Sequence, residues 1–266
     1  MIGTPEITIG RISVARSDVS VPLKDIVDEA VSPLRRFAGE IGAVVAATFS
    51  NPERFPSLAV RVADMMGLPK STMAFDLNMA CSAYPYAVYL AGKIASDIGR
   101  QVLLVDGDAQ LRLVDGSDRA TGNIFSDAVS ATMVGMSGGG NSRWMFLSSL
   151  SDSLRCSESG PISMDGMAVF SFVAKDVAAM LREFAGDAGS FDWFAPHQAN
   201  PYMVRQLARA LGLEDKLITL PEEIKNPGSA SIPLAISASG KTGRFMIAGF
   251  GAGYSAAAGT VRVTGE

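Results

Sequence analysis

Two twelve-residue segments of the chain resemble each other, and this internal repeat restricts the folds that the sequence can adopt. Phe75–Tyr86 contains Cys81, and Phe191–Tyr202 contains His197. Aligning them superposes Cys81 on His197, with matching Phe-Asp, Ala and Pro-Tyr around both. Such a repeat predicts two similar halves, whose pseudo-twofold axis would bring a thiol and an imidazole together. The alternative is a coincidence between two strand-to-helix turns of an α/β protein.

Apolar periodicity predicts alternating helices and strands along the chain. Helices are expected near residues 23–37, 57–66, 82–98, 166–185 and 201–211, and strands near 41–49, 72–77, 101–106, 128–136, 143–149, 193–195, 244–248 and 256–263. This alternation is typical of an α/β fold in which helices cover central sheets. The three glycines within residues 137–142 predict a linker, so we expect an N-terminal half over residues 1–137 and a C-terminal half over residues 138–266.

Composition excludes several classes of protein. A chain of 266 residues with 48% hydrophobic content can bury a large core, and a net charge of −4 with scattered Lys and Arg offers no surface for nucleic acid. No apolar run reaches the roughly 18 residues of a membrane span, and no targeting segment is visible, so we expect a cytoplasmic protein without membrane contacts. Two cysteines in unlike settings and one histidine argue against a disulfide or a metal site.

Cys81 is the first candidate for chemistry. It lies where a predicted strand ends and a helix begins, and the positive end of the helix dipole would favour its thiolate. The alternative is a small buried core residue, because free cysteine is among the most buried residue types. Cys156 lies in a polar, loop-like stretch without this geometry, so we interpret it as incidental.

His197, Asn226 and a glycine-rich turn are further candidates. His197 follows a predicted strand in Pro-His-Gln-Ala-Asn, although a single histidine is often structural. Asn226 stands in a turn-rich stretch that can also be read as a loop opening a helix. The run Gly249–Gly253 follows a strand and precedes another, so a backbone N–H close to a substrate oxygen fits it better than a dinucleotide loop does.

These four segments together resemble the β-ketoacyl-acyl-carrier-protein synthase III family of the thiolase superfamily, from about residue 23 to the end of the chain. The resemblance implies a five-layer αβαβα fold made of two similar halves, and a homodimer or a heterodimer with a related subunit. By this likeness Cys81 accepts an acyl group from a thioester. His197 and Asn226 then bind the carbonyl of a malonyl-type thioester, whose decarboxylation yields the attacking enolate. The N–H groups of Cys81 and Ala252 form the oxyanion hole of the acyl-transfer step.

The resemblance also assigns binding roles and partners. Phe55 matches a residue that reaches across the dimer to limit acyl length, and Arg119 matches one near the coenzyme A adenine. Tyr202 stands where an arginine that docks acyl carrier protein is common, with Arg205 close behind it on the same helix. Acyl-coenzyme A or acyl-carrier-protein thioesters are thus the expected substrates and partners, with no permanently bound cofactor.

The sequence departs from the family pattern at its beginning and at the glycine-rich turn. The family usually has several tens more residues between its first strand and first long helix, including a stretch that helps to bind coenzyme A, whereas here Val14–Pro22 bridges the gap. Ala252 replaces a usual glycine. Two alternatives to decarboxylative condensation therefore stay open: transfer of the acyl group to another nucleophile without decarboxylation, and a non-catalytic partner in a heterodimer.

Overall fold

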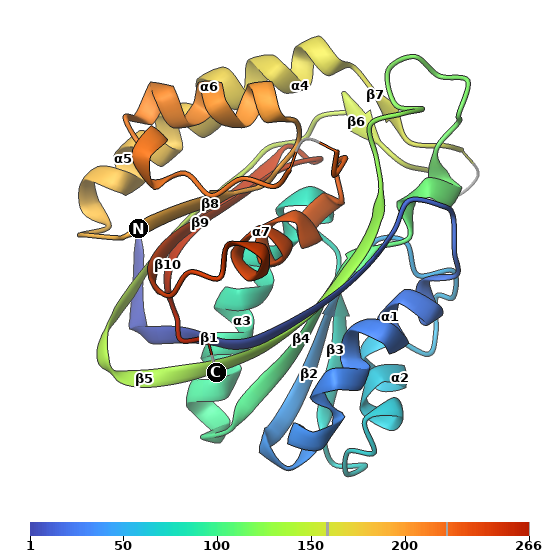
Figure 1. Cartoon of the computed structure of the whole chain (residues 1–266), viewed down its shortest axis with the longest axis vertical. Helices are drawn as coiled ribbons and strands as arrows, with labels where there is room; N and C mark the ends of the chain where they lie inside the picture. The colour runs from blue at the N-terminus through green and yellow to red at the C-terminus, as the bar shows by residue number, and fades with distance from the viewer. Residues whose placement is uncertain (158–159, 222, 266) are drawn as a thin grey trace.

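The computed structural model describes residues 1–157, 160–221 and 223–265, which form five layers (Figure 1). The outer layers hold α1 (Leu23–Val31) and α2 (Leu58–Met65) on one side, and α4 (Gly166–Phe172), α5 (Ala178–Asp187) and α6 (Pro201–Leu211) on the other. The middle layer consists of α3 (Ala83–Ile98) and α7 (Ser231–Ser239). Strands fill the two layers between, as the fold class expected from the sequence requires.

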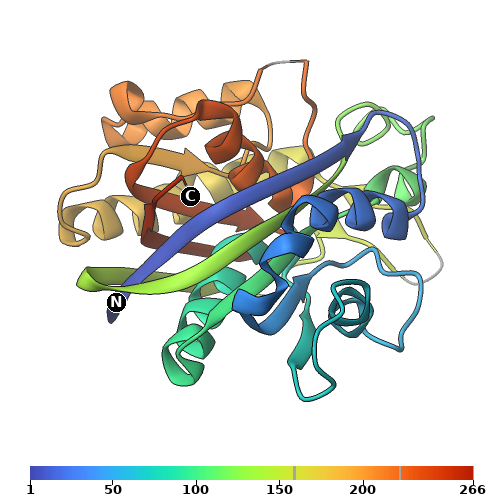
Figure 2. The same cartoon turned by 60° about the horizontal axis from the view of Figure 1, so that its bottom comes forward.

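Of the described strands, β6 (Leu154–Arg155) and β7 (Ser163–Met164) form a separate two-stranded sheet, and the other eight form one hydrogen-bonded sheet in the order β3-β2-β4-β5-β1-β10-β9-β8. Their bounds are β1 Ile2–Ser17, β2 Ile41–Ala47, β3 Met73–Leu77, β4 Gln101–Asp108, β5 Asp127–Ser148, β8 Trp193–Pro196, β9 Gly243–Gly251 and β10 Ser255–Val263. The first part of β5 pairs with β4 and β1, and its last part pairs with β10, so the sheet continues around the central helices. Figure 2 shows β1 and β5 running side by side through the molecule.

Short-range signals explain where several of these elements begin and end. Asn200 caps α6 by accepting a hydrogen bond from the N–H of Met203 at 2.8 Å, and Pro201 occupies the first turn, where its missing N–H costs nothing. Gly212 ends the same helix in the left-handed conformation. The helix and strand ranges predicted from periodicity are confirmed to within a few residues. The predicted helix at 166–185 contains a π-helical turn, Val173–Val177, between α4 and α5.

The predicted linker is wrong. β5 runs without a break through residues 137–142, and its pairing with β1 shifts register between Pro5 opposite Asn141 and Glu6 opposite Ser137. The glycines therefore form an exposed bulge within a strand, because flanking residues on both sides still pair with β1. The division of the chain into residues 1–137 and 138–266 stays a prediction.

The chain does contain two similar halves, but the register of the predicted repeat is wrong. β2 pairs in parallel with β3 and β4, and β8 likewise pairs with β9 and forms a bridge through Phe194 to Leu217. The unit β2-α2-β3-α3-β4 thus corresponds to β8-α6-Leu217-α7-β9. Cys81, at the start of central helix α3, corresponds to the segment that precedes α7, whereas His197 corresponds to Thr48 after β2. The sequence similarity between the two strand-to-helix turns did not indicate which of the helices lies in the middle layer.

Candidate active site

Cys81 is held in a tight turn between β3 and α3. It belongs to the short 3₁₀ helix η2, Ala80–Ser82, and Ala80 before it has φ of 43°, a left-handed conformation that a residue with a Cβ adopts only when its surroundings hold it there. Ser82 Oγ donates to the carbonyl of Met79 at 2.8 Å and lies 2.7 Å from Ser255 Oγ. These contacts fix the turn that carries the thiol against the start of β10.

The glycine-rich turn after β9 passes directly over Cys81. A Cβ added at Gly251 would lie only 2.7 Å from Cys81 Cβ and 3.4 Å from its Sγ, so no larger residue fits without displacing the cysteine. The backbone N–H groups of Cys81 and Ala252 both act on the sulfur and lower the pKa of the thiol. The turn after β9 and the 3₁₀ helix η2 therefore supply one N–H group each beside one sulfur, which is the arrangement that an oxyanion hole needs.

The backbone N–H of Cys81 at the helix start favours the thiolate, as expected, but burial of the thiol outweighs it. Burial raises the pKa of Cys81 to about 12, and the carboxylate of Asp108 adds to this rise, followed by that of Asp106. The opposing N–H groups of Cys81 and Ala252 do not compensate. At neutral pH the resting group is a thiol that is 8% exposed.

His197 is a buried, neutral imidazole at the end of β8. Its backbone N–H donates to the carbonyl of Ala248 at 2.7 Å, and burial lowers the pKa of the ring to about 4 although the backbone of Gly228 acts in the opposite direction. Ser231 Oγ accepts from the N–H of Gln198 at 3.1 Å and lies 2.8 Å from His197 Nδ1. In the tautomer in which Ser231 Oγ donates its own proton to Nδ1, the ring N–H is on Nε2.

Asn226 is fixed by its backbone and has one free donor group. Its N–H donates to the carbonyl of Ile124 at 2.8 Å, and its own carbonyl accepts from the N–H of Ser126 at 3.0 Å. Its side-chain Oδ1 accepts from the N–H of Gly228 at 2.9 Å, which orients the carboxamide. Its Nδ2 makes no hydrogen bond to any residue that the structure describes, so it remains available to donate.

The 3₁₀ helix η6, Gly228–Ala230, lies next to Cys81, His197 and Asn226. It packs against η2, which carries Cys81. Its Gly228 binds Asn226 Oδ1 and acts on the His197 ring. The ring of His197 also meets Phe250, the neighbour of Gly251, with centroids 5.4 Å apart. The structure thus brings Cys81, His197 and Asn226 to one region, from three elements that lie far apart in the chain.

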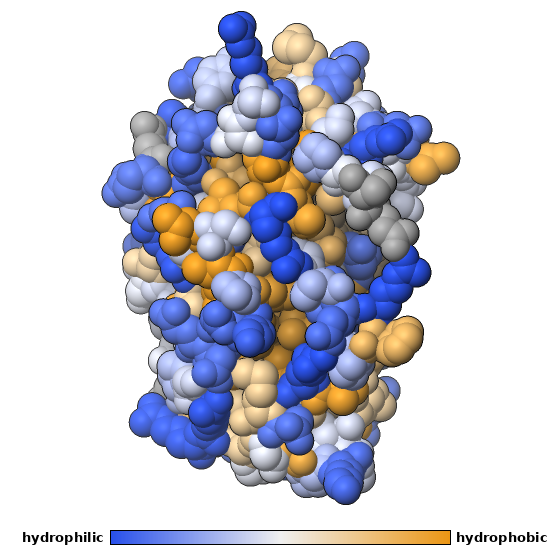
Figure 3. Space-filling view, turned by 90° about the vertical axis from the view of Figure 1, so that its right-hand side faces the viewer, coloured by the Kyte–Doolittle hydropathy of each residue, from blue (hydrophilic) through white to orange (hydrophobic). Residues whose placement is uncertain are grey.

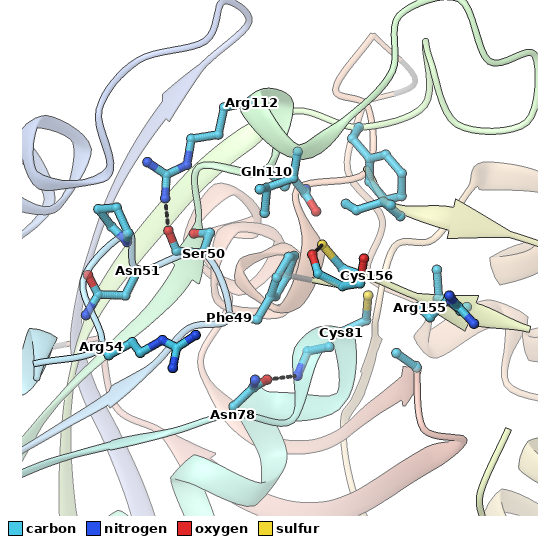
Figure 4. A pocket seen from close by; sticks show the side chains of 18 residues that line it. Phe49, Ser50, Asn51, Arg54, Asn78, Cys81, Gln110, Arg112, Arg155 and Cys156 are labelled. Atoms are coloured by element: carbon cyan, nitrogen blue, oxygen red, sulfur yellow. Dashed lines mark hydrogen bonds between the residues drawn. The ribbon is translucent and has the colours of Figure 1, made fainter. Parts of the chain in front are cut away.

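Cys81 and Ala252 open onto a cavity of about 610 Å³ (Figure 4). Most of its wall consists of residues from the segment after β2, the turn before α3, the segment after β4, and the hairpin of β6 (Leu154–Arg155) and β7 (Ser163–Met164); Phe125 and Ala252 complete it. Side chains from all four segments surround one space in Figure 4, including those of Phe49, Arg54, Gln110, Arg112, Arg155 and Cys156. Figure 3 shows the side of the molecule that faces right in Figure 1, where hydrophobic side chains gather between hydrophilic ones.

Of the predicted site residues, Cys81 and Ala252 line this cavity, whereas His197, Asn226, Phe55, Arg119 and Arg205 do not. Phe55 is 84% exposed, although its neighbour Arg54 lies in the cavity wall. Arg119 is exposed in the segment between β4 and β5, and Arg205 is exposed on α6 in an outer layer. Their predicted roles therefore depend on a partner or a ligand that reaches beyond this cavity, and they stay predictions.

Sequence analysis missed several residues of the cavity wall. Cys156, interpreted as incidental, lies in the same wall as Cys81. Arg112, whose guanidinium donates to the carbonyl of Ser50, and Arg155 also line it. Gln110 follows β4 and is 1% exposed. A polar residue directly after a buried strand was the only local signal for Gln110, and nothing local indicated that the β6–β7 hairpin would reach Cys81.

Within the described ranges, no helix is both long and apolar enough to cross a membrane. No group of three or more His, Cys, Asp or Glu side chains in the same ranges is arranged to hold a metal ion.

Known proteins resemble this chain in sequence. Residues 75–153 match the family model described as 3-oxoacyl-[acyl-carrier-protein (ACP)] synthase III, and residues 182–263 match the model of its C-terminal part. The chain is 29% identical over 242 residues to beta-ketoacyl-[acyl-carrier-protein] synthase III of Neisseria meningitidis serogroup B, covering 82% of this chain and 76% of that protein. It is 28% identical over 249 residues to the enzyme of the same name from Sphingopyxis alaskensis, with 84% and 77% covered.

Solved structures share the fold over nearly the whole chain. The 3-oxoacyl-(acyl-carrier protein) synthase of Burkholderia xenovorans has a TM-score of 0.90 at 23% identity, covering 98% of this chain and 95% of that one. The priming beta-ketosynthase of the R1128 polyketide pathway has a TM-score of 0.88 at 24% identity, with 98% of both chains covered.

Proposed function

Because the chain belongs to the β-ketoacyl-[acyl-carrier-protein] synthase III family, we propose that it joins an acyl group carried on Cys81 to a malonyl-type thioester. It has the thiolase-like five-layer fold and is an acyltransferase of the condensing class. One observation carries the proposal: a buried thiol beside two backbone N–H groups shares a region with a neutral imidazole and a carboxamide whose Nδ2 is free. These are the groups that acyl transfer and enolate formation require.

In the first step Cys81 attacks the carbonyl carbon of the incoming thioester. The new bond joins Cys81 Sγ to that carbon, the carrier sulfur departs, and the thiol proton ends on the departing carrier thiol. The N–H groups of Cys81 and Ala252 stabilise the oxyanion that forms during the attack. The proton that Cys81 Sγ loses is the one that the departing carrier sulfur gains. The step is therefore balanced in protons, and no residue of the protein has to keep the proton from this high-pKa thiol afterwards.

In the second step His197 and Asn226 bind the thioester oxygen of the extender. His197 Nε2–H and Asn226 Nδ2–H donate to this oxygen while the carbon–carbon bond to the carboxylate breaks, so that carbon dioxide leaves and an enolate remains. The enolate carbon then attacks the acyl carbon on Cys81, and the Cys81 thiolate departs and takes up a proton. A neutral imidazole suits this role, because it donates a hydrogen bond without trapping the enolate through a full charge.

The exposed arginines of the cavity support a phosphate-bearing carrier. Arg54, Arg112 and Arg155 are exposed and line the same cavity as Cys81. Guanidinium groups recognise phosphate through paired hydrogen bonds, and both coenzyme A and the phosphopantetheine of a carrier protein present phosphate. We therefore keep acyl-coenzyme A and acyl carrier protein as proposed substrates and partners in fatty-acid or polyketide-type synthesis, without a permanently bound cofactor, and a cytoplasmic location as a prediction.

A dimer formed at β3 fits the exposed features near the site. β3 lies at one end of the sheet order, and its Met73 is 50% exposed. Phe55, 84% exposed, lies close in sequence to the cavity residue Arg54. An unpaired edge strand and a bare aromatic ring are features that a partner subunit would cover. We propose that a second copy, or a related subunit, takes this place.

Mass spectrometry of the intact protein tests the function. The Cys156→Ser variant, which leaves one cysteine, should gain one acyl group from acyl-coenzyme A or acyl carrier protein, and malonyl thioester should then release a β-ketoacyl product with carbon dioxide. Cys81→Ala should gain none. His197→Ala and Asn226→Ala should slow condensation by about 10² to 10³ while sparing acylation.

Other outcomes would favour the alternatives. Release of the acyl group only by an alcohol or amine would indicate a non-decarboxylating acyltransferase. No adduct with any donor would indicate a non-catalytic subunit. Equal loss of both steps in Asn226→Ala would contradict the role given to Asn226.

A further inference from the structure

Two acidic side chains with unlike surroundings lie at the end of β4. Asp106 and Asp108 are two positions apart on this strand, and both are buried, at 0% and 1% exposure. Asp108 Oδ1 accepts hydrogen bonds of 2.7, 2.9 and 3.0 Å from residues 48–50. The two oxygens of Asp106 form no aligned hydrogen bond to any residue that the structure describes. A buried carboxyl group without partners is costly, and native proteins rarely keep one that has no role.

Two buried hydroxyl groups that also lack partners lie next to Asp106. Ser130 is directly opposite Asp106 in the antiparallel pairing of β4 with β5, so the two side chains share one face of the sheet. Ser229, in η6, brings its hydroxyl close enough to the Asp106 carboxyl to lower the pKa of that group. The Oγ atoms of both serines are buried and have no aligned partner in the described part of the chain. Small rotations of these side chains would pair the hydroxyls with the carboxyl.

The surroundings of Asp106 favour its uncharged form. Burial raises the pKa of Asp106 well above its ordinary value, the Ser229 hydroxyl acts against this rise, and Asp108 adds to it. Burial also raises the pKa of Asp108, but the Thr48 hydroxyl and the N–H of Phe49 oppose that rise. Of the two carboxyl groups, Asp106 is therefore the one that keeps its proton at neutral pH. A protonated carboxyl group can donate one hydrogen bond and accept others.

The 3₁₀ helix η6 connects Asp106 to the candidate active site. β4 packs against η6, and η6 in turn packs against η2. Gly228, which precedes Ser229, donates its N–H to Asn226 Oδ1 at 2.9 Å, and its backbone acts on the His197 ring. A hydrogen bond between Asp106 and Ser229 would therefore fix the segment that orients both donors of the condensation step.

We propose that Asp106 is a positioning residue of the condensation step, and that its carboxyl group holds η6 in place by a hydrogen bond with Ser229 Oγ. The inference rests on the proposed function, because it concerns the step that His197 and Asn226 serve. Asp106 acts on the extender only through η6, and acylation of Cys81 does not need this contact. An ionised Asp106 would act on the Cys81 sulfur and on a nearby enolate with the same negative charge, so the uncharged carboxyl group suits the site.

Separate rates of acylation and condensation test this proposal. In the Cys156→Ser background, both rates are measured by mass spectrometry with acyl-coenzyme A and malonyl thioester. Asp106→Ala and Ser229→Ala should each slow condensation about 10- to 100-fold and change acylation by less than about threefold. Asp106→Asn, whose amide donates and accepts as a protonated carboxyl group does, should condense within about threefold of the parent.

A double variant and a matched control make the test specific. The protein with both Asp106→Ala and Ser229→Ala should condense no more slowly than the slower single variant, because both changes remove one contact. Thr132→Val is the control: it removes a buried hydroxyl of β5 that lies 3.5 Å from Tyr84 OH, and the ratio of the two rates should stay as in the parent. Thermal unfolding shows which variants are folded at the assay temperature, and Ser229→Ala carries the same prediction where Asp106→Ala is not.

Four results would overturn the inference while the proposed function stands. They are equal slowing of both steps in Asp106→Ala, condensation at the parent's rate in Ser229→Ala, effects of the two changes that multiply in the double variant, and an Asp106→Asn protein as slow as Asp106→Ala. A parent protein that is acylated but does not condense contradicts the proposed function, and the parent alone shows it.

Discussion

Replacing Gly251 with alanine should disable Cys81 through a single methyl group. The added Cβ would lie 2.7 Å from Cys81 Cβ, about 0.7 Å inside the 3.4 Å at which ordinary contact begins. Both atoms belong to rigid backbone turns, so the strain has no flexible side chain to relax. Overpacking of this kind costs about 1 to 3 kcal/mol, which for a protein of this size lowers Tm by about 2 to 12 °C. Displacing a reacting atom by about 1 Å costs about 10² in rate.

Acylation rate and thermal unfolding together test this reasoning. The matched control is Gly39→Ala, since a Cβ at Gly39 meets nothing within 4 Å. The control should keep the parent's Tm and its rate of acyl adduct formation. Gly251→Ala should lose about a hundredfold in that rate even at a temperature well below its own Tm. A Gly251→Ala protein that is acylated as fast as the control would refute the close contact between the glycine-rich turn and the nucleophile.

Two predictions concern pH. Because burial raises the pKa of Cys81 to about 12, only about 10⁻⁴ of this residue is thiolate at pH 8. In the Cys156→Ser protein, the rate of Cys81 alkylation by iodoacetamide should therefore rise about tenfold per pH unit from pH 7 to 10. A plateau of this rate below pH 9 would contradict the raised pKa. The Arg262 guanidinium, which donates to Glu6 at 2.9 Å, holds the pKa of that carboxyl below its ordinary 4.5. Since the folded-state pKa of Glu6 is lower than the unfolded-state pKa, the Glu6–Arg262 pair stabilises the protein above about pH 4.5, and this stabilisation is lost as pH falls through the folded-state pKa. Glu6→Gln should therefore lower Tm at pH 7, and the difference in Tm from the parent protein should largely disappear near pH 3. An equal difference in Tm at both pH values would exclude the linkage.

The chemistry of the site could be predicted from short segments of sequence. The residues around Cys81, His197, Asn226 and Ala252 carry the family resemblance, and the structure brings these segments to one region around η6 and the turn after β9. Caps, glycines and apolar periodicity also predicted most helices and strands, because these signals act between residues a few positions apart. The long strand β1 was not predicted as an element.

Long-range packing decided the rest. The glycines of residues 137–142 read as a linker, yet they bulge within β5 because β1 pairs with the strand on both sides of them. The predicted repeat matched Cys81 to His197, but only the sheet order shows that α3 and α7 are the equivalent central helices. In the same way, the position of Cys156 in the wall of the Cys81 cavity depends on where the β6–β7 hairpin folds.

What the sequence indicated by itself is therefore the set of candidate reactive groups and the local elements that carry them. What only the tertiary structure decided is the environment of each group. Examples are the burial that keeps Cys81 a thiol, and the two carbonyls, 16 and 116 residues away, to which the NH₂ group of Gln110 donates. The physical reason is that protonation and hydrogen bonding depend on which segments exclude water around a group, and neighbours along the chain do not specify that.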